Sequence, residues 1–218
     1  MIWFTVSRKR QHPSSGGLRP ANRPPIGGVD NLILYGTMYY SNLKHRLPPV
    51  NAIKELIRNK INEAPAGVEG FFIDMDSGWG IKCYVHEDWR DECYFNQSRA
   101  AAIGVAPEVG GKFEIDFTLT YDDLDAIEEI NEYAEWVRCG PTPRLYCYYT
   151  EVVQMVFDRS VEYTDSELDS WWNSSRKERK KLYDILDNEA DLCCMDDHCF
   201  NWGRKGDKLV LVDYGYER

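Results

Sequence analysis

The stretch that decides the fold is DDHCFNWGRKGDKLVLVDYGYER (Asp196–Arg218). It places the acid Asp196 five residues before Asn201, and a Lys-Gly-Asp turn follows. The apolar run KLVLV after the turn reads as the second strand of a hairpin and leads into Asp213-Tyr214-Gly215. Because a hairpin brings its two open ends together, we predict that Asn201 and Asp213 lie side by side. Carboxylate and amide oxygens are ligands that magnesium accepts.

Two charged residues upstream extend this pattern. The segment GFFIDMDSGWGIKCYV predicts a hairpin whose second strand carries Lys82. The next segment, HEDWRDECYFNQSRAAAIG, predicts a helix of about four turns that is closed by Gly104 and has Glu92 near its front. A strand lysine paired with a helix glutamate is the arrangement that holds nucleotide phosphates in phosphoryl transfer. We therefore predict an ion pair between Lys82 and Glu92, with Glu87 as the alternative partner.

With these residues in this order, the sequence resembles the protein kinase-like superfamily, and especially its small-molecule kinases of the aminoglycoside phosphotransferase type. The segment DDHCFN (Asp196–Asn201) is similar to the family's catalytic loop Asp-Leu-His-Pro-Gly-Asn, and Asp213-Tyr214-Gly215 to its Asp-x-Gly. The chain also resembles short kinase-like proteins of bacteriophages. The resemblance extends from about Gly67 to Gly215.

The resemblance implies an α+β fold of protein kinase-like type, with an antiparallel-sheet N-lobe that includes a helix and a reduced helical C-lobe. It implies ATP and magnesium as cofactors. Lys82 and Glu92 would then bind the nucleotide, Asn201 and Asp213 would bind the metal, and Asp196 would be the catalytic residue that orients the acceptor hydroxyl.

We expect four segments in the chain. Residues 1–30 form a basic Pro/Gly-rich extended arm, and residues 31–65 form a helical extension. Residues 66–156 form the N-lobe with an acidic helical insertion at 120–140, capped by Thr120. Residues 157–218 form a minimal C-lobe that carries the catalytic loop and Asp-Tyr-Gly. Because Pro/Gly-rich basic segments bury little apolar surface, the arm is expected to bind a partner rather than support the core.

Apolar periodicity predicts several elements inside these segments. PPVNAIKELIRNKI predicts a helix with one apolar face, KFEIDFTLT a half-exposed strand, and RLYCYYTEVVQMVF a deeper strand that is covered on both faces. In SSRKERKKLYDIL, Ser175 and Glu178 have the spacing of a capping box. The same segment places Leu182, Ile185 and Leu186 on the buried side of the helix that follows.

The net charge of −10 is unevenly distributed. Residues 1–60 hold ten basic and two acidic residues, whereas the rest holds 16 basic and 34 acidic residues. A basic arm fits nucleic acid or an acidic protein partner, and the alternative is that it lies across the chain's own acidic part. No apolar run approaches the ~18 residues of a membrane span, so we expect no membrane partner.

The seven cysteines show no paired spacing, which favours reduced thiols and a cytoplasmic location, in a host cytoplasm or a virion if the chain is phage-encoded. We expect no zinc at Cys193, Cys194, His198 and Cys199, because no second Cys/His pair stands elsewhere in the sequence.

Three functions remain open at this stage. The first is a minimal magnesium-dependent ATP-binding phosphotransferase, which would lack the usual acceptor lobe because the chain ends three residues after Gly215. The second is a catalytically inactive kinase-like protein that serves in interaction or assembly, for example in a virion. No G-x-G-x-x-G loop precedes Lys82, which favours this second function. The third is nucleotidyl transfer with ATP reversed in the same site.

Overall fold

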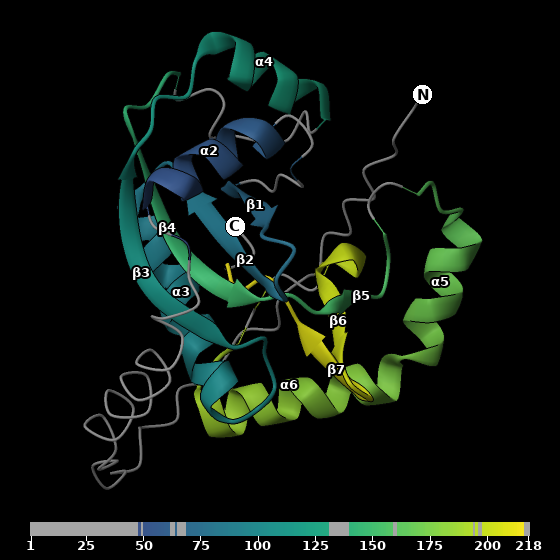
Figure 1. Ribbon diagram of the computed structural model, residues 1–218. Helices are drawn as coiled ribbons and strands as arrows, with labels where there is room; N and C mark the ends of the chain where they lie inside the picture. Colours follow the sequence, from purple (N-terminus) through teal and green to yellow (C-terminus); the bar gives the residue numbers. More distant parts are fainter. Residues whose placement is uncertain are drawn as a thin grey trace, which may run out of the picture.

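The computed structural model describes residues 48, 50–61, 64, 69–130, 140–158, 161–193, 195 and 198–215. The arm at residues 1–30 and the predicted catalytic residue Asp196 lie outside this part of the chain. The described residues form an α+β structure with two antiparallel sheets and several helices (Figure 1).

The larger sheet has four strands in the order β1-β2-β4-β3, and all three pairings are antiparallel. The strands are β1 (Gly70–Asp74), β2 (Trp79–Tyr84), β3 (Val109–Asp116) and β4 (Arg144–Glu151). The predicted hairpin of β1 and β2 is confirmed, and Gly78 has a φ of +79° in its turn, a value that glycine adopts without strain. The deeper strand predicted from RLYCYYTEVVQMVF is β4, which lies between β2 and β3.

Two helices cover opposite faces of this sheet. Helix α2 (Val50–Lys60) packs Ile53 and Ile57, both fully buried, against the side chains of Ile81, Cys83 and other strand residues that point to the same face. Helix α3 (Glu87–Ala102) packs on the other face, where its Cys93 joins a cluster with Tyr84 and Tyr148. Since strand side chains alternate between faces, Lys82 points to the α3 side.

The smaller sheet has the order β5-β6-β7. Its strands are β5 (Gln154–Met155), β6 (Trp202–Lys205) and β7 (Lys208–Leu211), and Gly206 takes a φ of +60° in the predicted hairpin turn. Helix α6 (Arg176–Ala190) runs beneath this sheet in Figure 1. Its Leu182 and Leu186 pack with Trp202, whereas Ile185, which we predicted to be buried, is half-exposed.

Two helix N-terminal caps were predicted from the sequence, and the structure confirms the one at Thr120 but not the one at Ser175. Helix α4 (Tyr121–Ile130) begins at Thr120 as predicted, because the Thr120 hydroxyl accepts from Asp123 N at 3.2 Å. The predicted capping box at Ser175 is wrong, since Ser175 has helical φ and ψ and makes no capping bond. The capping box is that of Thr164 and Glu167, on a helix the sequence analysis missed, α5 (Asp165–Ser174).

The described helices differ from membrane-spanning helices in length and composition. None of them has both the length and the apolar composition that a bilayer span requires.

The buried face of α2 yields a stability prediction. Replacing Ile57 by alanine removes a fully buried side chain from the larger core and should lower the free energy of unfolding by about 2–5 kcal/mol, measured by urea denaturation. The matched control Glu55→Ala changes an exposed position of the same helix and should cost under about 0.5 kcal/mol. Equal losses for both variants would contradict the packing of α2 on the sheet.

Candidate functional site

The β6–β7 hairpin brings Asn201 and Asp213 to its open end, as the sequence predicted. The register pairs Trp202 with Leu211, and the ladder continues one step further because Val212 N donates to Asn201 O at 2.9 Å. Asp213 is the next residue after Val212. Asn201 is buried in a short 3-10 turn, η3 (Cys199–Asn201), whereas the side chain of Asp213 is 41% exposed.

Lys82 reaches this hairpin end from the larger sheet. Its Nζ donates to Val212 O at 2.6 Å and lies 4.0 Å from Asp213 Oδ1, and its side chain is only 15% exposed. Lys82 therefore forms an ion pair with Asp213, and the predicted pair with Glu92 stays a prediction. The hydrogen bond from Lys82 to Val212 therefore joins two residues that are 130 positions apart in the sequence.

The helix residue beside this pair is Cys93, one position after Glu92. Its sulfur faces the Asp213-Tyr214-Gly215 segment, since a Cβ atom placed on Gly215 would lie 3.8 Å from it. One step along an α-helix rotates the side chain by about 100°, so Cys93 and Glu92 project in different directions. Glu92 is half-buried on the same helix, and its role in nucleotide binding stays a prediction.

The side chains under Lys82 and Asp213 are uncharged at neutral pH. Burial, and after it the negative charge of Asp213, raises the pKa of the Cys93 thiol to about 12. Burial likewise raises the pKa values of Tyr84 and Tyr148 well above the ordinary value for tyrosine. The Tyr148 hydroxyl donates to the Gln97 side chain at 2.9 Å. The cation and the carboxylate thus lie on a layer of neutral, hydrogen-bonded side chains.

Two further polar residues touch the Asp213-Tyr214-Gly215 segment, and the sequence analysis missed both. A Cβ atom placed on Gly215 would lie 3.5 Å from Glu69 Oε2, so the Glu69 carboxylate faces this segment from the start of β1. The buried Asn96 of α3 donates to the Tyr214 carbonyl at 3.1 Å. Tyr214 itself is fully buried. No local sequence pattern distinguishes Glu69 or Asn96 from other polar residues of the chain.

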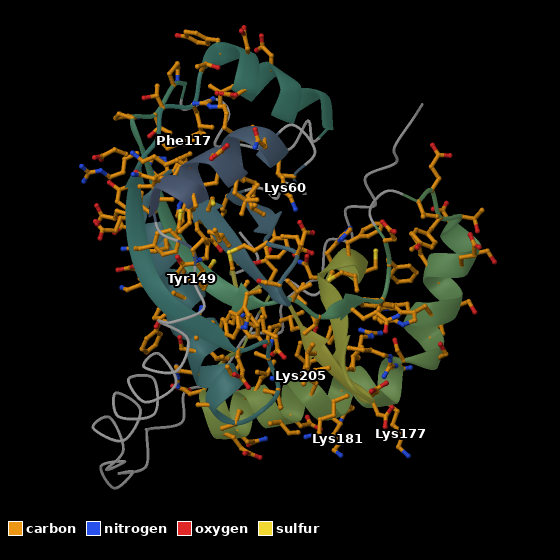
Figure 2. All side chains as sticks on the ribbon, in the orientation of Figure 1. Lys60, Phe117, Tyr149, Lys177, Lys181 and Lys205 are labelled. Carbon is orange, nitrogen blue, oxygen red and sulfur yellow. The ribbon has the colours of Figure 1, made fainter. Side chains whose placement is uncertain are left out.

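A second charged contact joins the two sheets at the other end of the hairpin. Lys205, labelled in Figure 2, places its Nζ 2.7 Å from Glu151 at the end of β4 and 3.3 Å from Glu108. Burial alone lowers the pKa of Lys205, but the hydrogen bonds and charges of the two carboxylates outweigh it and raise the pKa. Lys82 and Lys205 together hold the hairpin against the larger sheet from its two ends.

The hairpin end carries oxygen ligands of the kinds that magnesium accepts. Magnesium in nucleotide sites is usually held by one or two protein carboxylates, with phosphate oxygens and water as the remaining ligands. Asp213 offers one half-exposed carboxylate of this kind, and Asn201 is its neighbour through the backbone ladder. Within the described residues no group of three or more His, Cys, Asp and Glu side chains is arranged to hold a metal by itself.

Comparison of the chain with protein-family models, with curated proteins and with solved structures found no match.

The raised pKa of Cys93 leads to a prediction about reactivity. The thiolate is the nucleophile, and a thiol with a pKa of about 12 is almost wholly protonated at pH 8. Iodoacetamide at pH 8 should therefore modify the exposed Cys193 of the folded protein and leave Cys93 unmodified, as read by peptide mass spectrometry. In denaturant both should react, and fast modification of Cys93 in the folded protein would contradict its placement.

Proposed function

We propose that this chain is a kinase-like protein that binds magnesium and ATP at the open end of the β6–β7 hairpin and transfers a phosphoryl group to an acceptor. The observation that carries the proposal is the convergence of Lys82, Asn201 and Asp213 from two different sheets onto one place. Phosphoryl transfer depends mainly on positioning and on neutralising phosphate charge, which a lysine and a bound magnesium supply.

The connectivity around Lys82 supports the same proposal. In protein kinases the lysine stands on a strand of the N-lobe sheet, and the helix that follows carries its acidic partner. Here the lysine strand β2 is followed directly by α3, and the chain then adds two more antiparallel strands, of which β4 returns to lie beside β2. The asparagine precedes this hairpin and the Asp-x-Gly segment follows it, so both stand at its open end.

The chain's own residues have distinct parts in the proposed reaction. Lys82 and Asp213 neutralise each other in the structure, and on nucleotide binding Lys82 would turn to the phosphates while Asp213 and Asn201 would hold magnesium. The metal held by these two residues would reduce the negative charge of the phosphates. The neutral layer of Tyr84, Cys93 and Tyr148 adds no competing charge. Asp196, outside the described residues, is the proposed acceptor of the proton from the substrate hydroxyl.

One observation favours the second candidate function, a nucleotide-binding interaction or assembly protein without catalysis. Lys82 is paired with Asp213, the proposed metal ligand, and also donates to the Val212 carbonyl. A lysine whose ion-pair partner is the metal-binding aspartate must be released before it can orient phosphates. Nucleotide binding without turnover is the expected behaviour if that release is incomplete.

Thermal unfolding tests nucleotide binding. Magnesium and ATP at about 100 times the dissociation constant should stabilise the protein by about 2.7 kcal/mol, which raises the Tm by roughly 5–10 °C. Asp213→Asn should abolish the rise, because it removes the charge that attracts magnesium. The matched control Asp207→Asn, in the exposed hairpin turn, should keep it. No rise in the wild type, or the same rise in Asp213→Asn, would overturn the site.

Transfer of the terminal phosphate of labelled ATP separates the two candidate functions. The phosphotransferase proposal expects magnesium-dependent release or transfer that Lys82→Met and Asp213→Asn lower at least about 100-fold, as expected when a group that stabilises the transition state is lost. A Tm rise with no release or transfer would support the non-catalytic alternative.

A further inference from the structure

Helix α6 carries a group of exposed cations that the proposed function does not use. The helix begins RKERKK, and four of its basic residues, Arg176, Lys177, Lys180 and Lys181, are exposed. They stand at i, i+1, i+4 and i+5, so they form two adjacent rows on one side of the helix. We call these four residues the basic strip. Figure 2 shows Lys177 and Lys181 pointing away from the body of the protein at its lower edge.

The two other charged residues of RKERKK, Glu178 and Arg179, make contacts within the protein. Glu178, the single acid among the six residues, pairs with Arg204 at 3.2 Å and accepts from Leu209 N. Arg179 is buried, and its guanidinium lies 3.3 Å from the ring centre of Trp172. The acid that could neutralise the basic strip is therefore already paired, and the remaining arginine of the segment, Arg179, points inward.

The basic strip itself is nearly uncompensated. Lys180 makes an exposed ion pair with Asp184 at 3.4 Å, a type of contact worth little in water. Within the part of the chain that the structure describes, Arg176, Lys177 and Lys181 make no ion pair. A shallow hollow of about 520 Å³ lies along the strip, lined by Ser174, Lys177, Glu178, Lys180, Lys181 and Asp184.

We propose that the basic strip binds the phosphate backbone of a nucleic acid without reading its base sequence. Protein–protein interfaces are enriched in aromatic residues and depleted in lysine. The basic strip has the opposite composition, because three of its four residues are lysines and the exposed large apolar residues of the described chain, Phe95, Tyr121 and Val161, lie outside α6. Backbone contacts to nucleic acid are made mainly by long cationic side chains of this kind.

The charge of the remaining chain restricts where a polyanion binds. The whole chain carries −10, so most of its surface repels phosphate. A local cluster of cations on a negative protein then favours one orientation of the bound strand. The inference is independent of the proposed function, because it uses neither Lys82 nor the hairpin end.

Fluorescence anisotropy with a labelled DNA or RNA oligonucleotide of about 20 nucleotides tests the inference on the full chain. The logarithm of the binding constant falls linearly with the logarithm of the salt concentration. Each phosphate contact that is lost reduces the magnitude of this slope by about 0.7–0.9. The variant Lys177→Gln/Lys181→Gln should therefore weaken binding roughly tenfold or more near 100 mM salt and reduce the slope by about 1.4–1.8. The control Lys54→Gln/Lys112→Gln removes the same charge elsewhere and should bind like the wild type.

Three outcomes would overturn the inference. The wild type could fail to bind at about 50 mM salt. The strip variant could keep the affinity and slope of the wild type, which would assign binding to another segment, such as the basic arm. Polyglutamate could bind as tightly as the oligonucleotide and be lost in the same variant, which would make the strip a docking surface for an acidic protein. An unchanged Tm of both variants shows that each is folded.

Discussion

The arrangement of this protein depends on Lys82, which joins its two sheets. A partly buried ammonium is costly unless hydrogen bonds and an opposite charge compensate it. Lys82 obtains both from the hairpin end, through Val212 O at 2.6 Å and Asp213 Oδ1 at 4.0 Å. The lysine therefore constrains where the hairpin can lie relative to β2, and with it the position of Asn201 and Asp213.

The surroundings of Lys82 strengthen this constraint because they offer few other charges. Tyr84, Cys93 and Tyr148 are buried and neutral, and two amide side chains of α3, those of Asn96 and Gln97, bond to uncharged groups. Asn96 donates to the Tyr214 carbonyl, and Gln97 bonds to Thr150 and Tyr148. Helix α3 thus connects the hairpin segment to β4 by hydrogen bonds, while the ion pair at Lys82 keeps its electrostatic strength in a site of low exposure.

A second constraint acts at the turn of the hairpin, where Lys205 pairs with Glu108 and Glu151. These two acids also bond to each other's backbones, since Glu151 N donates to Glu108 O and Glu108 N to Glu151 Oε2. Two lysines on opposite sheets, each paired with acids on the other, hold the hairpin at both ends. Any opening of the space between the sheets must weaken at least one of these contacts.

The sequence by itself determined the features that depend on neighbouring residues. The hairpin that brings Asn201 to Asp213, the apolar face of α2 and the cap at Thr120 all follow from patterns within a dozen residues. Only the tertiary structure decided that Asp213 pairs with Lys82 and that Cys93 of α3 joins the buried cluster with Tyr84 and Tyr148. The physical reason is that the rotation of α3 about its axis is set by packing against the sheet and the second core. A spacing of ten residues between a strand lysine and a helix acid does not encode that rotation.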